Sequence, residues 1–244
     1  MKQAIAHTKN LTHLMETAEA LSRRGKDLPG IGMIWGPSGA GKTTGAVWLR
    51  DRSDAICVRA MRLWRPAAML AAICKELDVL PSPRCAPMLD QVIERLRQSQ
   101  RPVIIDEADY LIQSPALLDT LRDIHDVSSA PIIVIGMGTF RQRVQGKEQF
   151  SGRIAQIVEF RPADLDDVRA TAEACCEVAL DDALLERITR ETQGSMRRVK
   201  TALSVVEQWA DRRGETLVTA AAWGTQPLDG TVGAGRRLPP GGAR

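Results

Sequence analysis

An eight-residue segment near the start of the chain combines glycines, a lysine and a hydroxyl in a spacing suited to binding phosphate. It follows the apolar run 31–35 and reads GPSGAGKT. Its glycines let successive backbone N–H groups turn inward around phosphate oxygens, at the positive end of a following helix. Lys42 can reach the β- and γ-phosphates, and the Thr43 hydroxyl can bind Mg²⁺. A coincidental glycine-rich turn is the alternative, and the strand and helix expected on either side argue against it.

The segment therefore predicts a site for ATP and Mg²⁺. We expect the nucleotide to contact nine consecutive residues: Gly36, Pro37, Ser38, Gly39, Ala40, Gly41, Lys42, Thr43 and Thr44.

Two acidic residues, Asp106 and Glu107, directly follow the apolar run 103–105. A strand there would place Asp106 at the carboxyl end of a parallel sheet, where its carboxylate can hold Mg²⁺ together with Thr43. Glu107 can polarise a water for attack on the γ-phosphate. The alternative is an acidic helix start, since Asp-Glu-Ala-Asp also suits a first helical turn. We favour a catalytic role because Lys42 requires a metal-binding carboxylate nearby, and Glu107 favours hydrolysis over phosphate transfer.

The elements that must position these groups alternate between helices and short apolar strands. Strands are expected at 31–35, 55–58, 103–105, 132–135 and 154–160, with helices over 11–24, after Lys42, from Pro66, and over 89–96. This order predicts an α/β fold in which helices flank a parallel sheet on both faces.

The pattern changes after Pro162. Asp164 and Asp181 are expected to cap helices, and no strands are expected between the helices that follow. We therefore expect three parts: residues 1–161 as an α/β nucleotide-binding core with an N-terminal helix, 162–213 as a small all-helical unit, and 214–244 as a disordered, weakly basic tail rich in glycine and proline.

Composition sets few limits on function. The 244 residues include 33 basic and 30 acidic ones, so the net charge of +3 does not by itself indicate a nucleic-acid partner. The five cysteines form no Cys-x-x-Cys pair, which argues against a disulfide framework or a zinc site. No apolar run approaches the ~20 residues needed to cross a bilayer. We expect no membrane partner and a cytoplasmic location.

Taken together, these motifs resemble the AAA+ branch of P-loop ATPases over roughly residues 10–213. The resemblance implies that residues 162–213 form a helical lid. It assigns Thr139, after the fourth strand, as the polar sensor, although the asparagine common in other branches is missing. It also assigns Arg153 as an arginine finger that enters a neighbouring subunit's site, with a surface contact as the alternative. Arg197 in Gly-Ser-Met-Arg is the lid sensor for the γ-phosphate, with Arg198 as its competitor.

Within that branch the chain looks most like the transposition ATPases of the phage Mu B protein type. The resemblance rests on GPSGAGKTT, IIDEAD, the strand ending IVIG and the lid motif G-S-x-R-R. It implies an ATPase that binds double-stranded DNA without strong sequence preference, self-assembles with ATP into filaments or rings, and recruits or activates a transposase. One departure is that no extra N-terminal DNA-binding domain is apparent, because the sheet begins near Ile31.

Two short basic clusters are the candidates for DNA contact. The first, after the second strand, is Arg59, Arg62 and Arg65; the second, after the fourth strand, is Arg141, Arg143 and Lys147. Arginine and lysine on phosphates give affinity without base reading. A solvated basic face, or salt bridges to a neighbouring subunit, is the alternative.

Other functions share the same nucleotide motifs. A helicase-loader-like or secretion-associated AAA+ ATPase differs only in its partner. A P-loop kinase acting on a small molecule would need an acceptor pocket, and Glu107 with an all-helical lid argues against it. A nucleotide-locked interaction module that hydrolyses poorly is a further possibility.

Overall fold

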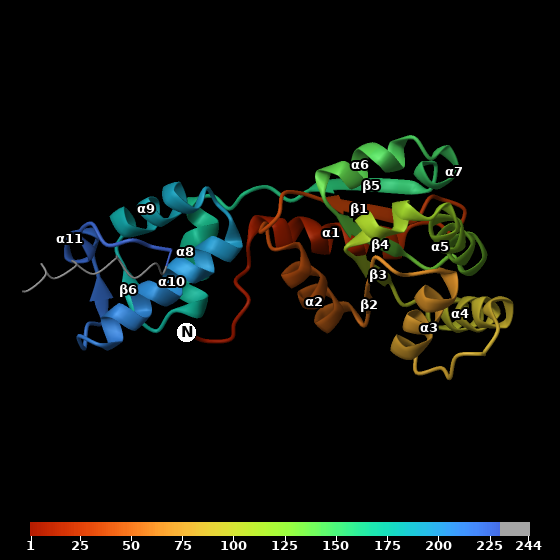
Figure 1. Ribbon diagram of the computed structural model, residues 1–244, viewed down its shortest axis with the longest axis horizontal. Helices are drawn as coiled ribbons and strands as arrows, with labels where there is room; N and C mark the ends of the chain where they lie inside the picture. The colour runs from red at the N-terminus through yellow and green to blue at the C-terminus, as the bar shows by residue number, and fades with distance from the viewer. Residues whose placement is uncertain (230–244) are drawn as a thin grey trace, which may run out of the picture. The chain divides into compact units, whose positions relative to one another are not determined.

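A five-stranded parallel sheet forms the centre of the larger of two compact units, residues Thr8–Arg161 (Figure 1). The computed structural model describes residues 1–229. The strands are β1 (Ile31–Trp35), β2 (Ile56–Arg59), β3 (Val103–Asp106), β4 (Ile132–Gly136) and β5 (Ile154–Glu159). Their order across the sheet is β2-β3-β4-β1-β5, and every neighbouring pair is parallel. The predicted α/β class and all five predicted strands are confirmed.

The central strands β3 and β4 are apolar, apart from Asp106 at the end of β3, because both of their faces are covered. In β3 and β4 every residue is buried. Alternate side chains therefore enter two different cores: Ile104 and Ile133 face one side, whereas Ile105 and Val134 face the other. A near-continuous apolar run is what a parallel sheet covered on both faces requires.

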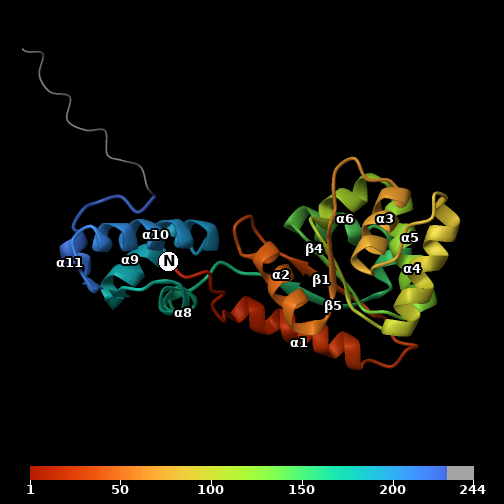
Figure 2. The same ribbon diagram turned by 90° about the horizontal axis from the view of Figure 1, so that it is seen from below.

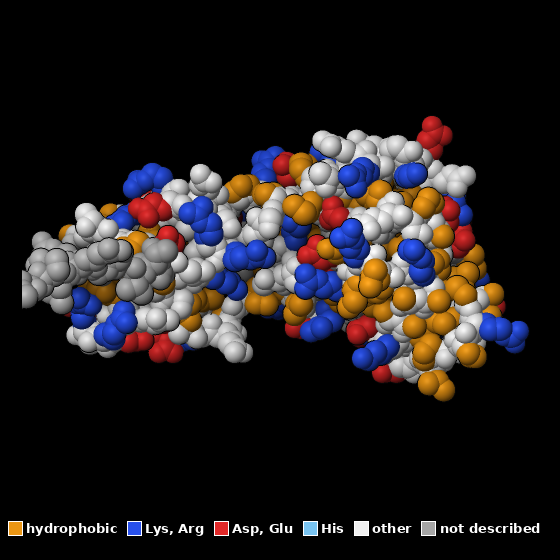
Figure 3. All heavy atoms as spheres, in the orientation of Figure 1, with side chains coloured by type: hydrophobic (Ala, Val, Ile, Leu, Met, Phe, Trp, Pro, Cys, Tyr) orange, Lys and Arg blue, Asp and Glu red, His pale blue; other side chains and the backbone are white. Residues whose placement is uncertain are grey.

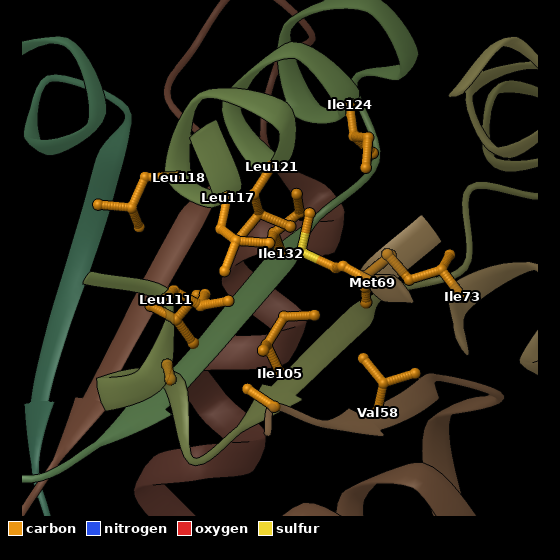
Figure 4. Close-up of a cluster of buried hydrophobic side chains, with 14 of the residues drawn as sticks. Val58, Met69, Ile73, Ile105, Leu111, Leu117, Leu118, Leu121, Ile124 and Ile132 are labelled. Atoms are coloured by element: carbon orange, nitrogen blue, oxygen red, sulfur yellow. The ribbon is translucent and has the colours of Figure 1, made fainter. Parts of the chain in front are cut away.

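Helices α1 (Lys9–Arg23) and α2 (Lys42–Ser53) cover one face of the sheet, and α3 (Pro66–Glu76), α4 (Cys85–Ser99) and α5 (Pro115–Ser128) cover the other (Figure 2). Figure 4 shows the second of these cores, where side chains of α3 and α5 meet those of β2, β3 and β4. The short elements η1 (Ala108–Gln113), α6 (Gly138–Gln145) and α7 (Glu148–Ser151) complete the unit.

The second compact unit contains Met1–His7 and the chain from Pro162 onward. Its elements are α8 (Leu165–Cys175), β6 (Ala179–Leu180), α9 (Asp182–Thr192), α10 (Met196–Asp211), β7 (Leu217–Val218) and α11 (Ala220–Trp223). The first residues belong to it because the Lys2 amide donates to the Cys175 carbonyl at 2.7 Å. The predicted caps are present: the Asp164 carboxylate accepts from the Asp167 amide, and that of Asp181 from the Leu184 amide.

Two expectations about this region are wrong. The unit is not all-helical, because β6 and β7 pair in parallel. Residues 214–229 are also not a disordered tail: Trp223 is 2% exposed and packs edge-on against Trp209 with ring centroids 5.5 Å apart, and Leu228 is buried. The apolar side chains of this segment complete the core of α8, α9 and α10. The remainder of the predicted tail, 230–244, lies outside the described residues.

Within residues 1–229, no helix is both long enough and apolar enough to span a bilayer.

Candidate nucleotide-binding site

The loop between β1 and α2 has the backbone geometry that a phosphate cradle needs. Gly39 and Gly41 have φ of 82° and 88°, in the left-handed region that side chains disfavour. At Gly36 the constraint is steric, since an added Cβ would lie 2.4 Å from the Phe160 carbonyl oxygen. Gly36 thus lets the end of β1 pack closely against the end of β5. The loop ends at Gly41, which is the N-cap of α2, and the helix begins at Lys42.

Lys42 already lies over this loop. Its Nζ is 2.7 Å from the carbonyl oxygens of both Gly36 and Pro37. The first turn of α2 contains no acidic residue, so the positive end of the helix dipole is not offset there. Thr43 is exposed and Thr44 half-buried at the same turn. An ammonium, a helix N-terminus and a hydroxyl at one loop form a site for the phosphates of a nucleotide.

Asp106 lies at the carboxyl end of β3 and is 4% exposed. One strand, β4, separates β3 from β1, so Asp106 and the loop lie about 10 Å apart along the same edge of the sheet. Asp106 also affects a neighbouring group. Burial, together with the negative charge of Asp106, raises the pKa of the Cys57 thiol to about 11. Asp106 therefore lies at the same edge of the sheet as the phosphate loop.

Glu107 has an unusual backbone. Its φ of 54° and ψ of 39° are left-handed, at a residue that is not glycine. Such a conformation costs on the order of 1–2 kcal/mol, and residues held this way gather at functional sites. It occurs where β3 ends and η1 begins, with Glu107 as the N-cap of η1.

Arg59 reaches Glu107 from the neighbouring strand. Its Nη2 donates to Glu107 Oε1 at 3.1 Å. The contact follows from the sheet, because Arg59 ends β2 in register with Asp106. The side chains are 62% and 34% exposed, so this is a surface ion pair rather than a buried one. Arg59 was predicted as a member of a DNA-contacting cluster, and its contact with Glu107 was not predicted.

Asp109 holds the loop that carries the predicted sensor. Its Oδ2 accepts from the Met137 amide at 2.8 Å, and its Oδ1 accepts from the Thr139 hydroxyl at 3.4 Å. Thr139 lies in the first turn of α6, which follows β4, so the contact joins the ends of β3 and β4. Asp109 was not predicted as a site residue. The only signal in the sequence is its place in the Asp-Glu-Ala-Asp segment.

Arg153 lies at the opposite edge of the sheet from the loop. It directly precedes β5, and its carbonyl accepts from the amide of Ile31, the first residue of β1. Its guanidinium donates two hydrogen bonds to the Asp126 carboxylate, from Nε to Oδ1 at 3.2 Å and from Nη2 to Oδ2 at 3.0 Å. The length of β5, about 17 Å, separates it from the carboxyl edge. The structure therefore does not bring Arg153 to the site of its own chain.

The two arginines proposed for the lid sensor lie in the second unit and differ in their contacts. Arg198 donates to the carbonyls of Glu191 and Thr192, at the end of α9. Arg197 is exposed, and both side chains line a hollow of about 520 Å³ in this unit. Arg198 is thus engaged in holding α9, which leaves Arg197 as the better candidate for a ligand contact.

The remaining predicted DNA contacts lie on exposed or half-exposed positions. Arg62, Arg65, Arg143 and Lys147 are exposed. Arg141 is half-buried, with its guanidinium 4.9 Å from the ring centre of Trp35, the last residue of β1. Arg141 therefore lies near the same edge as the phosphate loop.

The residues present fit a nucleotide with its magnesium ion. Among residues 1–229 no three His, Cys, Asp or Glu side chains cluster as a metal-binding group. Mg²⁺ is commonly bound by one or two protein oxygens together with substrate phosphates and waters. Thr43 and Asp106 are the residues that would supply these two oxygens, beside the loop that would hold the phosphates.

Comparisons with known proteins agree with this geometry. A family model described as an AAA domain matches residues 24–144. The ORC2 protein of Aeropyrum pernix, solved as ADPNP–ADP complexes, is 18% identical with a TM-score of 0.72, covering 91% of this chain and 68% of that one. The ORC1 protein of the same organism, solved in complex with DNA, is 22% identical with a TM-score of 0.59, covering 89% and 63%. CDC6P of Pyrobaculum aerophilum is 17% identical with a TM-score of 0.64, covering 89% and 66%.

The chain spans about two thirds of the length of these solved structures. No curated protein matches its sequence. At these identities the likeness concerns the fold. The matched segment, the strand order and the phosphate-binding loop together show that the chain has the AAA+ P-loop NTPase fold, with the AAA domain matched over residues 24–144.

Proposed function

We propose that this protein is an ATPase that binds duplex DNA without sequence preference, assembles on it in an ATP-dependent manner, and recruits or activates a transposase there. The observation that carries the proposal is the Arg59–Glu107 contact. Arg59 belongs to the basic segment 59–65 and also touches the glutamate placed to activate water. DNA binding and ATP hydrolysis therefore share a residue.

The chain's own groups suit hydrolysis. Mg²⁺, when bound with ATP, would offset phosphate charge between Thr43 and Asp106. Lys42 leaves the carbonyls of Gly36 and Pro37 to bind the β- and γ-phosphates. The Glu107 carboxylate accepts a hydrogen bond from a water and orients it toward the γ-phosphorus. Thr139, held by Asp109, lies in the loop at the end of β4, where it can contact the γ-phosphate or that water.

Assembly supplies a group that one chain lacks. Arg153 is at the far edge of the sheet and cannot serve its own nucleotide, and its partly exposed guanidinium is paired with Asp126 within its own chain. An arginine that enters a neighbouring site stabilises charge on the γ-phosphate during transfer, with large effects on rate. We propose that Arg153 of one subunit completes the site of the next, and that Arg197 contacts the γ-phosphate from the second unit.

The identity of the partner protein is proposed separately. A transposase is proposed because the sequence motifs resemble those of the Mu B type. A helicase-loader-like role is the second candidate, favoured by the likeness in fold to ORC and CDC6 proteins, one of them solved with DNA.

ATP hydrolysis measured with and without duplex DNA, alongside electron microscopy of the same samples, tests the proposal. We expect DNA to stimulate hydrolysis and polymers to form only with ATP or a non-hydrolysable analogue. A monomer whose hydrolysis is indifferent to DNA would refute it. Capture of a transposase rather than a replicative helicase by the ATP-bound polymer would separate the two partners.

A further inference from the structure

The turn that follows β2 exposes two large apolar side chains among arginines. Leu63 is 89% exposed and Met61 is 61% exposed. Between and beside them lie Arg62 and Arg65, and the segment 59–65 contains no acidic residue. In Figure 3 hydrophobic side chains gather over the part of the core that carries α3 and α4, with lysines and arginines around them.

This turn is held rigidly at both ends. Before it, the Ala60 amide donates to the Asp106 carbonyl at 2.8 Å, and Ala60 is 2% exposed. After it, Trp64 is buried in the core beneath α3, and its amide donates to the Met61 carbonyl at 3.0 Å. Arg62 and Leu63 are thus the central residues of a closed four-residue turn. Little conformational entropy remains to be lost when its tip binds a partner.

We propose that the turn Met61–Trp64 is a wedge that enters the minor groove of duplex DNA, with Leu63 inserted between adjacent base pairs. Arg62 and Arg65 then contact the phosphates on either side. The proposal rests on the DNA binding proposed above and adds to it a distortion of the duplex. Proteins that kink DNA combine these same parts, an apolar leucine or methionine wedge and flanking arginines.

Charge and size select DNA over a protein partner. A stable protein interface buries about 800 Å² on each side and has an apolar centre with a polar rim. Here the tip itself carries two apolar side chains, Met61 and Leu63, and its neighbours in the chain, Arg62 and Arg65, are cations; other exposed hydrophobic side chains lie over α3 and α4 (Figure 3). One inserted side chain suffices to unstack a base step, and phosphates flank every step.

Contacts beside the wedge can offset the free energy that its insertion costs. Unstacking a base step costs a few kcal/mol, which further contacts must offset. The same segment offers Arg59, which lies on Glu107 at the base of the turn. DNA seated on the tip therefore lies against the segment that contacts the catalytic carboxylate.

Duplexes carrying 2-aminopurine at successive positions, with donor and acceptor dyes at their ends, report unstacking and bending together. The protein would be tested with ATPγS as wild type, Leu63→Ser and Leu80→Ser. Leu80 is the matched control, because it is 88% exposed on the loop between α3 and α4. We expect wild type and Leu80→Ser to brighten 2-aminopurine and shorten the dye distance. The Leu63→Ser variant should bind DNA with an affinity within about tenfold of that of wild type. It should neither brighten 2-aminopurine nor shorten the dye distance.

Three results would overturn the proposal, and they differ in what else they affect. If wild type binds DNA without unstacking or bending it, or Leu63→Ser behaves like Leu80→Ser, the wedge fails while the proposed DNA-binding function stands. If Leu63→Ser abolishes ATP-dependent assembly in the absence of DNA, the turn is a contact between protein subunits. If wild type does not bind duplex DNA at all, the proposed function fails and the wedge with it.

Discussion

Arg59 Nη2 lies 3.1 Å from Glu107 Oε1, although the two residues are 48 positions apart in the chain. Pairing with a guanidinium draws a carboxylate's lone pairs and charge away from water. Because both side chains are partly exposed, a DNA phosphate can compete with Glu107 for Arg59. We therefore expect the contact to restrain hydrolysis in the absence of DNA, and DNA to release it.

Replacing Arg59 with alanine should raise basal ATP hydrolysis and reduce its stimulation by DNA. An exposed ion pair contributes up to about 1 kcal/mol, which corresponds to a rise of up to about fivefold in rate. Steady-state ATPase assays with and without duplex DNA measure both effects. Arg50→Ala is the control, because Arg50 forms an exposed ion pair with Asp51 on α2. A basal rate that falls toward that of Glu107→Gln would contradict this role.

Asp109→Ala should lower kcat by about tenfold or more while KM for ATP changes little. Without the carboxylate, the Met137 amide and the Thr139 hydroxyl lose their partner, and small misplacements of site groups have large effects on rate. Asp109→Asn keeps an acceptor oxygen and should recover part of the loss. In a double-mutant cycle, Thr139→Ala should add little to Asp109→Ala. Fully additive effects would show that Asp109 does not act through Thr139.

Arg153 should act on the nucleotide of a neighbouring subunit. We expect Arg153→Ala and Glu107→Gln each to hydrolyse ATP poorly with DNA present, and a mixture of the two to regain activity. In the mixture, Glu107→Gln subunits supply the arginine and Arg153→Ala subunits supply the glutamate. The rate of the mixture against its separate components measures this directly. A mixture no more active than the average of its components would be evidence against a role in trans.

His125 should make stability depend on pH. Burial lowers the pKa of His125 below its ordinary value, and its Nδ1 donates to the Ala130 carbonyl at 3.0 Å. Above pH ~6.5 the imidazole is neutral in both states, so its contribution is fully present. As pH falls below ~6.5 the unfolded state binds a proton first, and the free energy of unfolding decreases by up to about 1.4 kcal/mol per pH unit. Below the folded-state pKa the loss levels off.

Urea unfolding at pH 7.5 and pH 5 measures this dependence. From pH 7.5 to pH 5, the free energy of unfolding should decrease more for wild type than for His125→Gln. His13→Gln provides the control, because His13 is exposed on α1. Parallel losses for wild type and His125→Gln would contradict the assignment.

The sheet and the phosphate loop could be read from the sequence because their signals are local. Apolar runs such as 103–105 and 132–135 mark strands buried on both faces, and Asp164 and Asp181 mark helix starts. The folding of 214–229 was missed because this segment was grouped with the glycine- and proline-rich residues 224–244 that overlap and follow it. Leu217, Val218 and Trp223 do not follow one period, and α8–α10 supply the surface that buries Val218 and Trp223.

The contacts of Arg59 and Asp109 could not be read, because each depends on strand neighbours far apart in sequence. Arg59 meets Glu107 only since β2 pairs with β3 in a register that sets Arg59 opposite Asp106. Asp109 meets Thr139 only since β4 lies beside β3. From the local sequence, an arginine in a basic cluster is predicted to contact DNA. Only the strand order shows that a carboxylate lies beside it.

The central claim is that nucleotide at Lys42 controls binding to DNA. The most direct measurement is the affinity for a fluorescent duplex of mixed sequence, with and without ATPγS, for wild type and Lys42→Ala at equal salt. We predict that ATPγS tightens binding by wild type at least about tenfold, a coupling of about 1.4 kcal/mol, and leaves Lys42→Ala unchanged. Equal affinity and equal assembly for the two proteins with ATPγS would contradict the account.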